Sequence, residues 1–310
     1  MITVYPDYYE DFQCTAGKCK HNCCIGWEID IDENTAQYYS SINGFMGEKL
    51  KSSISKVPIP HFILNHNERC PFLNNNNLCD IIINLGKDKI CTICKEHPRF
   101  YNNLDNWTEI GLGLCCEEAA RIILNNKEHI NLIINGDYDT APQIVLIRDQ
   151  VIKILQDDTL PIQDRLNNIQ KTFKIGSVSF DMSKWLYFLK SLERLDKDWD
   201  NYLDLISEKI HLVDFEEFTA YISDRIYEYE QFCVYIAYRH LLNAQSDLDF
   251  IARVKFIFFA FNLIFNISAC IFHTNKHFST EDLIELVRLF SSEIEYSDIN
   301  LDLILDELIK

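Results

Sequence analysis

The spacing of hydrophobic residues changes near Cys116. From there apolar side chains recur every three or four positions, first at Ala119, Ala120, Ile123 and Leu124, and then through Ile130 and Ile133. This period of about 3.6 residues predicts amphipathic helices. Further stretches with the same period cover residues 141–157, 161–173, 183–195, 198–210, 215–245, 247–273, 280–294 and 298–309. None of them shows the alternation of a half-buried strand, so the C-terminal part is predicted to be a helical array.

The first 125 residues have a different pattern, with apolar runs too short for long helices and Asn-rich turns such as Asn74 to Asn77. We therefore predict a mainly α protein of two parts. Residues 1–125 would form an irregular, cysteine-rich metal-binding domain. Residues 126–310 would form an α-helical domain that binds the substrate.

Two helix starts carry capping signals. Thr280 precedes Glu281 and Asp282, and Ser297 precedes Asp298. Side-chain oxygens and negative charge are favourable beside the exposed N–H groups of a helix start.

The most apolar run extends from Lys255 to Phe272 and only reaches the lower length limit of a membrane span. It contains Asn262 and Asn266, which share a helix face because they are four residues apart. A central helix of a bundle with one polar stripe is therefore favoured over a membrane span.

Ten of the twelve cysteines lie between Cys14 and Cys116. They form closely spaced groups: Cys14, Cys19, Cys23 and Cys24; Cys70 and Cys79; Cys91 and Cys94; Cys115 and Cys116. Thiolates at such spacing are typical ligands of Zn²⁺ or an iron–sulfur cluster. Spacing does not separate these two, although ten cysteines exceed the four ligands of one structural zinc site. Cys233 and Cys270 lie on apolar helices and are predicted to be small core residues.

A disulfide framework is the competing interpretation of the cysteines. Such frameworks suit small secreted domains, whereas 310 residues with 47% hydrophobic content suffice for a conventional core. Met1 to Phe12 also lack the basic and apolar regions of a secretory signal. We therefore expect a cytoplasmic protein with reduced thiols.

The formal net charge is −18, and residues 126–310 contribute most of it, with 18 Lys and Arg against 31 Asp and Glu. The resulting negative electrostatic potential repels the phosphate backbone of nucleic acid and attracts a lysine-bearing protein surface. Solubility alone is the simpler explanation of the same charge. We expect neither a nucleic-acid partner nor a membrane.

Several ordered motifs in the first 125 residues resemble those of the flagellin lysine N-methylase family, a group of zinc- or iron-chelating cysteine-cluster proteins. The matching positions are Cys14, Cys19, Cys23 and Cys24 with Gly26-Trp27; Arg69-Cys70-Pro71-Phe72-Leu73; Leu78-Cys79; Cys94 with Pro98-Arg99; and Cys116-Glu117-Glu118-Ala119-Ala120-Arg121. The helical part resembles the family only in its layout and in the stretch from Tyr235 to Arg239.

The resemblance implies an enzyme that transfers a methyl group from S-adenosylmethionine to lysines of flagellin or another lysine-bearing protein, with a 4Fe-4S cluster taking part and Zn²⁺ as the alternative. The metal ligands it implies are Cys14, Cys19, Cys23, Cys24, Cys70, Cys79, Cys94 and Cys116. Eight thiols exceed the four that one cluster needs. Cys91 and Cys115 are additional to the family pattern, and His97 replaces an aromatic residue before Pro98, so each is an alternative ligand.

The chemistry of methyl transfer suggests further residues. No glycine-rich turn of a conventional nucleotide-binding fold is present, because Gly111 and Gly113 form only an isolated pair. Arg99 is a catalytic candidate and the candidate for binding the S-adenosylmethionine carboxylate, since arginine pairs with carboxylates through two parallel hydrogen bonds. A structural salt bridge is the alternative role for Arg99.

The acceptor amine must lose a proton before it can act as a nucleophile. Glu230 and Tyr235 are the catalytic candidates, with Tyr238, Arg239 and His240 nearby. Tyr235 and Arg239 are expected to share a helix face, because they are four residues apart.

Two functions from other classes fit the same cysteines. One is a non-catalytic zinc- or iron–sulfur-binding interaction protein. The other is a thiol redox or metal-delivery protein that uses Cys91 and Cys94.

Overall fold

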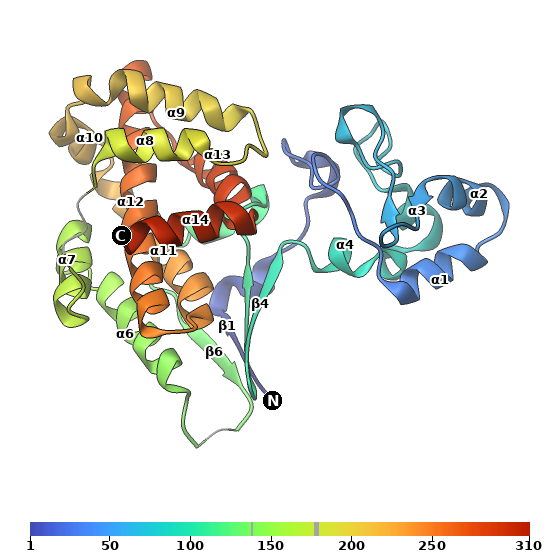
Figure 1. Ribbon diagram of the computed structural model, residues 1–310, viewed down its shortest axis with the longest axis horizontal. Helices are drawn as coiled ribbons and strands as arrows, with labels where there is room; N and C mark the ends of the chain where they lie inside the picture. The colour runs from blue at the N-terminus through green and yellow to red at the C-terminus, as the bar shows by residue number, and fades with distance from the viewer. Residues whose placement is uncertain (138, 177–179) are drawn as a thin grey trace. The chain divides into compact units, whose positions relative to one another are not determined.

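The computed structural model describes residues 1–137, 139–176 and 180–310, and it confirms a mainly α-helical protein (Figure 1). The chain divides into two compact units. The helical unit comprises residues 1–12, 101–115 and 119–310, and the cysteine unit comprises residues 13–100 and 116–118. The expected division placed one boundary at residue 125. Residues 1–12 and 101–115 belong to the helical unit instead, because they supply strands to its sheet.

The sheet of the helical unit contains β1 (Ile2–Pro6), β5 (Trp107–Leu112) and β6 (Leu132–Asn135), with β4 (Arg99–Leu104) entering it from the cysteine unit. The strand order is β4-β5-β1-β6. β1 runs parallel to β5, with Ile2 opposite Trp107, and antiparallel to β6, with Val4 opposite Ile134.

The prediction of a helix that continues to Ile133 is therefore wrong. Helix α5 (Glu117–Leu124) ends early, and Ile133 lies in β6. The strand is stabilised by backbone hydrogen bonds to β1, a segment more than 120 residues away in the chain. Local periodicity contains no information about such a partner.

The remaining predicted helices are present with shifted ends. They are α6 (Gln143–Leu155), α7 (Ile162–Thr172), α8 (Met182–Ser191), α9 (Asp198–Lys209), α10 (Phe215–Tyr221), α11 (Ile226–His240), α12 (Asp247–Asn275), α13 (Thr280–Phe290) and α14 (Asp298–Leu308). The stretch predicted as one helix over 215–245 is two helices, separated by a 3₁₀ turn at Ser223–Arg225. Ser223 and Asp224 favour such turns, because their short polar side chains compete with helical backbone hydrogen bonds. Arg225 also donates to the Phe278 carbonyl at 2.7 Å, which holds the break in place.

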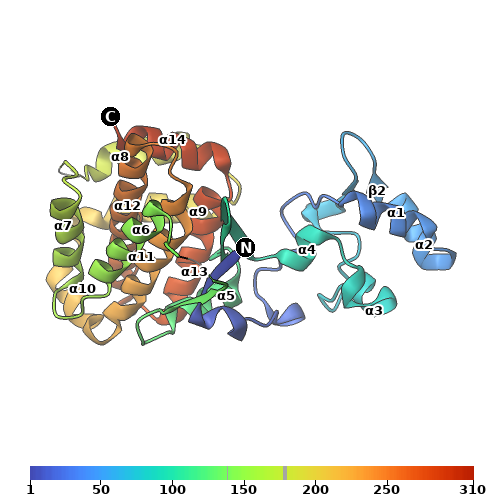
Figure 2. The same cartoon turned by 90° about the horizontal axis from the view of Figure 1, so that it is seen from below.

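Helix α12 is the central helix of this unit and packs against α9, α11 and α14. Both views show α11 and α12 side by side (Figures 1 and 2). By length and composition α12 is apolar enough to cross a membrane, but 72% of its most apolar window is buried inside the protein. Asn262 lies on its half-buried side and donates to the Phe258 carbonyl at 2.8 Å. These contacts favour a core helix. The predicted core positions of Cys233 on α11 and Cys270 on α12 are also confirmed, because both side chains are buried.

The predicted cap of α14 is confirmed, because the Ser297 side chain accepts from the Asn300 N–H. The cap of α13 lies one residue before the predicted Thr280. Ser279 accepts from the Asp282 N–H, and the Asp282 side chain accepts from the Ser279 N–H in return. This reciprocal capping box satisfies two backbone donors at once.

The cysteine unit is built from short elements. They are α1 (Glu33–Ser41), α2 (Gly44–Ser52), β2 (Ile54–Ser55), β3 (His61–Phe62), α3 (Asp80–Leu85) and α4 (Thr92–Glu96). A small core holds them together, formed by Ile29, Ile31, Tyr39, Leu50, Phe62, Phe72 and Ile81 together with Cys70 and Cys91.

Candidate functional site

All eight predicted metal ligands lie within the cysteine unit. Five thiols gather at its small core, where two are buried and three pack against them. We refer to these residues as the central thiol group: Cys24, Cys70, Cys79, Cys91 and Cys94.

Backbone contacts bring this group together. The Cys70 N–H donates to the Cys24 carbonyl at 2.8 Å, which joins two groups that are far apart in the sequence. The Asn-rich turn is confirmed, since Asn77 N–H donates to the Asn74 carbonyl and Leu73 pairs with Cys79. The turn therefore returns Cys79 to the neighbourhood of Cys70.

Cys14, Cys19 and Cys23 lie on a loop that approaches the same turn. A Cβ atom on Gly17 would lie only 2.8 Å from the carbonyl oxygen of Asn76, so this close approach requires glycine. The Thr15 hydroxyl and the Cys19 thiol are 2.9 Å apart.

The end of this loop also contacts the segment that carries Cys116. The Lys20 N–H donates to Glu117 Oε2 at 2.9 Å. This bond fixes the residue next to Cys116 beside the loop of the first three cysteines.

Neighbouring thiols shift the acidity of one another. A hydrogen bond with the Cys24 thiol lowers the pKa of Cys23 and raises the pKa of Cys24. The bond between Cys91 and Cys94 likewise lowers the pKa of Cys91 and raises that of Cys94. Burial raises the pKa of Cys70 to about 11. A soft metal replaces such protons, because the thiolate is the ligand.

The donor chemistry fits a zinc ion or an iron–sulfur cluster, since five thiols are gathered at one core. Across residues 1–137, 139–176 and 180–310, no three His, Cys, Asp or Glu side chains are already arranged as a metal site. Cys91 instead bonds to Cys94, and Cys24 bonds to Cys23. The central thiol group thus supplies ligands of a suitable type close together at one core.

Arg99 and His97 follow α4 closely. Arg99 is the first residue of β4 and is half-buried. The His97 ring lies 6.1 Å from the Trp27 ring, and burial lowers the pKa of His97 to about 4.

The helical unit contains a second candidate site around the Tyr235 hydroxyl. As predicted, Tyr235 and Arg239 share a face of α11, and Arg239 Nη1 donates to the hydroxyl at 2.8 Å. The Leu114 N–H also donates to it, at 3.2 Å, and the hydroxyl itself donates to Glu295 Oε2 at 3.1 Å. The hydroxyl therefore donates its one proton and accepts with both of its lone pairs.

Glu295 joins the same residues from the other side. Its Oε1 atom lies 3.3 Å from Arg239 Nε and 2.6 Å from His240 Nε2. Burial alone would raise the pKa of Glu295, but the charge of Arg239 and the bond to His240 outweigh it and lower the pKa.

The outer edge of this group is open to solvent. The Arg239 guanidinium lies 4.7 Å from the centre of the Tyr296 ring, a cation–π distance. Tyr296 is partly exposed, and its side chain interacts with Cys115. We refer to these residues as the Tyr235 cluster: Cys115, Tyr235, Arg239, His240, Glu295 and Tyr296.

Glu295 and Tyr296 were not identified from the sequence. The predicted helix over 280–294 ends in a π-helical turn at Ser291–Glu295, which changes the direction of the side chains. One signal was available, because Glu293 and Glu295 flank Ile294 at the end of a mostly apolar stretch. Both are buried.

The structure does not bring Glu230 to the Tyr235 cluster. Glu230 is buried in an ion pair with Arg165, which also donates to the Leu155 carbonyl at 2.8 Å. Tyr238 likewise points elsewhere, since its hydroxyl donates to the Val4 carbonyl at 3.0 Å. These contacts are those of structural residues.

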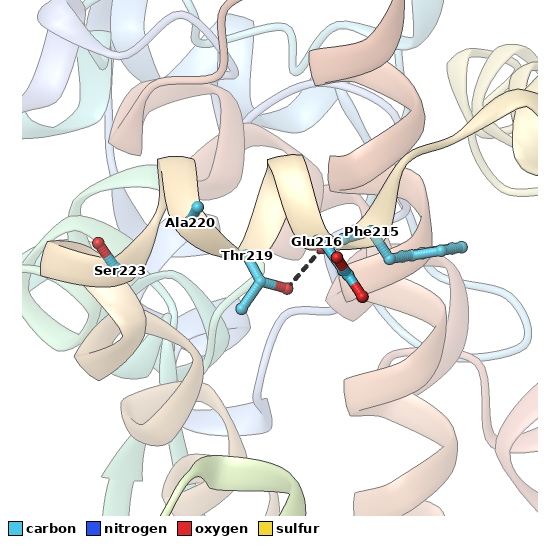
Figure 3. A pocket seen from close by; sticks show the side chains of 5 residues that line it. All are labelled: Phe215, Glu216, Thr219, Ala220 and Ser223. Carbon is cyan, nitrogen blue, oxygen red and sulfur yellow. Dashed lines mark hydrogen bonds between the residues drawn. The ribbon is translucent and has the colours of Figure 1, made fainter.

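A shallow hollow lies along α10 in the same unit (Figure 3). It is lined by Phe215, Glu216, Thr219, Ala220 and Ser223, and the Thr219 hydroxyl donates to the Phe215 carbonyl at 2.7 Å. The hollow contains one carboxylate and no residue of the Tyr235 cluster.

Residues 110–310 match the model of the FliB lysine N-methylase C-terminal domain. This chain is 27% identical over 157 residues to the lysine-N-methylases of Salmonella choleraesuis and Salmonella typhimurium, which covers 46% of this chain and 38% of each relative. It thus spans less than half of the length of these relatives. It is also 27% identical over 143 residues to the flagellar biosynthetic protein FliU of Salmonella muenchen, covering 42% of this chain and 82% of the relative. No solved structure matches.

Proposed function

This chain belongs to the FliB lysine N-methylase family, and from that premise we propose that it is a protein lysine N-methyltransferase whose substrate is flagellin. The observation that carries the proposal is the match over residues 110–310, the part of the chain that contains most of the helical unit and the Tyr235 cluster. The name of the FliU relative supports a flagellar substrate. The excess of acidic residues over 126–310 also suits a cationic, lysine-bearing protein surface.

The methyl donor in this proposal is S-adenosylmethionine, and a 4Fe-4S cluster takes part, with Zn²⁺ as the alternative metal. The central thiol group would hold the metal, with Cys14, Cys19, Cys23 and Cys116 as the other candidate ligands. Such a cluster, when bound, would supply an iron that could bind the amino and carboxylate groups of S-adenosylmethionine. Arg99, five residues after Cys94, is proposed to bind the same carboxylate.

Tyr235 is proposed as a positioning residue. Its hydroxyl already contacts Leu114, Arg239 and Glu295, so it holds these groups in place and has no lone pair left for a substrate proton. Glu230 keeps its charge paired with Arg165, and no role in proton transfer is assigned to it.

We place the activity in the cytoplasm. A chain with twelve cysteines keeps them as thiols only where the surroundings are reducing. The buried position of α12 favours a protein that is not embedded in a membrane.

The test is methylation of flagellin by protein purified without oxygen. Recombinant flagellin from the organism that encodes the chain is incubated with the protein and S-adenosylmethionine, and its mass is measured. The expected result is a gain of one or more methyl groups on lysine. Flagellin with reductively blocked lysines and a reaction without S-adenosylmethionine are the controls.

Unchanged flagellin mass with fully loaded protein would overturn the proposal. Bound metal without turnover and without saturable S-adenosylmethionine binding would identify an interaction protein instead. A labile metal together with a reversible Cys91–Cys94 dithiol would identify a redox or metal-delivery protein.

A further inference from the structure

The cysteine unit contains an apolar hollow of about 660 Å³ that is open to solvent. It lies beside the small core that holds the central thiol group, since Ile31 belongs to that core and Ile93 packs against it. Its floor is formed by Ile31, Ile59, Pro60 and Ile93. Ile59 is 50% exposed although it is a large aliphatic residue. The hollow therefore leaves apolar surface uncovered.

Two carboxylates border this floor. Asp30 and Glu33 are both exposed, and no described side chain forms an ion pair or a hydrogen bond with either of them. Asp32, between them in the sequence, is used differently: its oxygens accept from the N–H of Thr35 at 3.0 Å and of Thr92 at 2.9 Å. The hollow thus combines an apolar floor with two negative charges that form no ion pair with a described cationic side chain. Glu33 also lies in the first turn of α1, where the helix N-terminus favours a carboxylate.

The hollow is held open by backbone contacts from three segments. The Ile31 N–H donates to the Pro60 carbonyl at 2.7 Å, and the Phe62 N–H donates to the Ile29 carbonyl at 3.0 Å. The Asp32 side chain ties the start of α1 to the start of α4 through Thr92. A ligand would enter a site that exists before it binds, which lowers the entropy cost of binding.

We propose that this hollow docks a lysine side chain of the protein substrate. The four methylene groups of lysine match the apolar floor, and its ammonium group would lie between the carboxylates of Asp30 and Glu33. Apolar contact along the stem and charge contact at the tip are the two features that the hollow offers together. The partner is thus a lysine-bearing polypeptide, and its identity as the methylated protein rests on the proposed function.

The docked lysine is a different one from the lysine that is methylated. Two nearby carboxylates favour the charged ammonium form and raise its pKa. Methyl transfer needs the neutral amine. The hollow therefore contributes to substrate binding, and its loss should raise KM and leave kcat unchanged.

The test uses a fluorescein-labelled decalysine peptide and the full-length protein, with binding followed by fluorescence anisotropy. Asp30→Asn and Glu33→Gln each remove one charge without changing the side-chain shape. Each is expected to weaken binding by about two- to fivefold at low salt, and the differences should shrink as salt screens the charges. Ile59→Ala is expected to weaken binding at all salt concentrations, because it removes part of the floor.

The matched control is Glu48→Gln, which removes one exposed charge from α2 in the same unit. A carbodiimide that joins lysine amines to nearby carboxylates is used in parallel, with the crosslinked peptide located by mass spectrometry. We expect crosslinks at Asp30 and Glu33. Equal binding by the control and the hollow variants, crosslinks only elsewhere, or equal binding of an acetylated peptide would overturn the docking site.

These measurements distinguish failure of the proposed function from failure of the docking site. Peptide docking at the hollow with no methylation of flagellin by the loaded protein would leave the docking site intact and remove the methylase assignment. Methylation with the same KM in the wild type and in Asp30→Asn would leave the methylase assignment intact and remove the docking site.

Discussion

Arg239 donates a hydrogen bond from Nη1 to the hydroxyl of Tyr235, one turn earlier on α11, at 2.8 Å. The two residues are neighbours on one helix, but each also contacts a residue from a distant segment of the chain. The Tyr235 hydroxyl accepts from Leu114 after β5, and Arg239 pairs with Glu295 at the end of the π-helical turn. One side-chain pair thus joins the sheet, α11 and the turn before α14.

Replacing Tyr235 by Phe should lower the free energy of unfolding by about 1–3 kcal/mol, because the Leu114 N–H and Glu295 lose a buried partner. Urea denaturation measures this change. Methylation by the folded variant should also fall, since Arg239 loses its anchor.

Tyr229→Phe is the matched control on the same helix. The Tyr229 hydroxyl is equally buried, but it makes no hydrogen bond of normal geometry and has only a weak interaction with Ser268. Its removal should leave stability unchanged or raise it slightly, because a buried hydroxyl without a normal partner costs free energy. Equal losses in the two variants would contradict the role of the Tyr235 hydroxyl as a junction.

Glu109 and Arg148 form a fully buried ion pair, with Glu109 Oε2 at 2.6 Å from Nη1 and Oε1 at 2.7 Å from Nη2. Glu109→Gln removes the buried carboxylate that contacts both Nη atoms and leaves only the exposed Asp149, 2.8 Å from Nε, as an ion-pair partner. It should cost about 3–5 kcal/mol. Thermal or urea denaturation tests this value.

Two further variants are compared with Glu109→Gln. Replacing both partners by apolar residues of similar volume, Glu109→Leu with Arg148→Met, should recover much of the loss, because no buried charge remains. Asp204→Asn, which breaks the exposed pair with Lys190, should change stability by at most about 1 kcal/mol. A small effect of Glu109→Gln would show that water reaches Arg148.

Burial lowers the pKa of His240, and Arg239 and Arg253 act in the same direction, although Glu295 opposes them. The folded state therefore binds the His240 proton less tightly than the unfolded state. Its contribution to stability is complete above the usual pKa of about 6.5 and is lost as the pH falls below that value.

The difference in unfolding free energy between the wild type and His240→Gln isolates this contribution from other titrating groups. The wild type should lose stability relative to the variant between about pH 7.5 and pH 5. A difference that is independent of pH would contradict a lowered pKa.

Anaerobically purified protein should contain iron and acid-labile sulfide, measured by chemical assay and visible absorption. Cys70→Ser or Cys79→Ser should abolish most of the bound iron, because both belong to the central thiol group. Cys233→Ala, in the core of the helical unit, should leave the iron content unchanged. Stoichiometric zinc without sulfide would favour the alternative metal.

Much of the helical unit could be predicted from the sequence, because helix formation depends on residues three and four positions apart. The 3.6-residue period placed α6 to α9 and α12 to α14 within a few residues of their observed ends. The same rule predicted that Tyr235 and Arg239 meet. The cysteine spacing likewise identified the part of the chain that gathers the thiols.

The sheet and the full Tyr235 cluster required the tertiary structure. Strand β6 depends on β1, and Glu295 reaches His240 only because a π-helical turn redirects it. Glu230 and Tyr235 look equivalent on one helix in the sequence, yet one pairs with Arg165 and the other with Leu114, Arg239 and Glu295. The sequence by itself determined most of the helices of the helical unit and the segment that carries the thiols, because both follow from near neighbours. The partners of buried polar groups were decided by the fold alone, because they come from segments far apart in the chain.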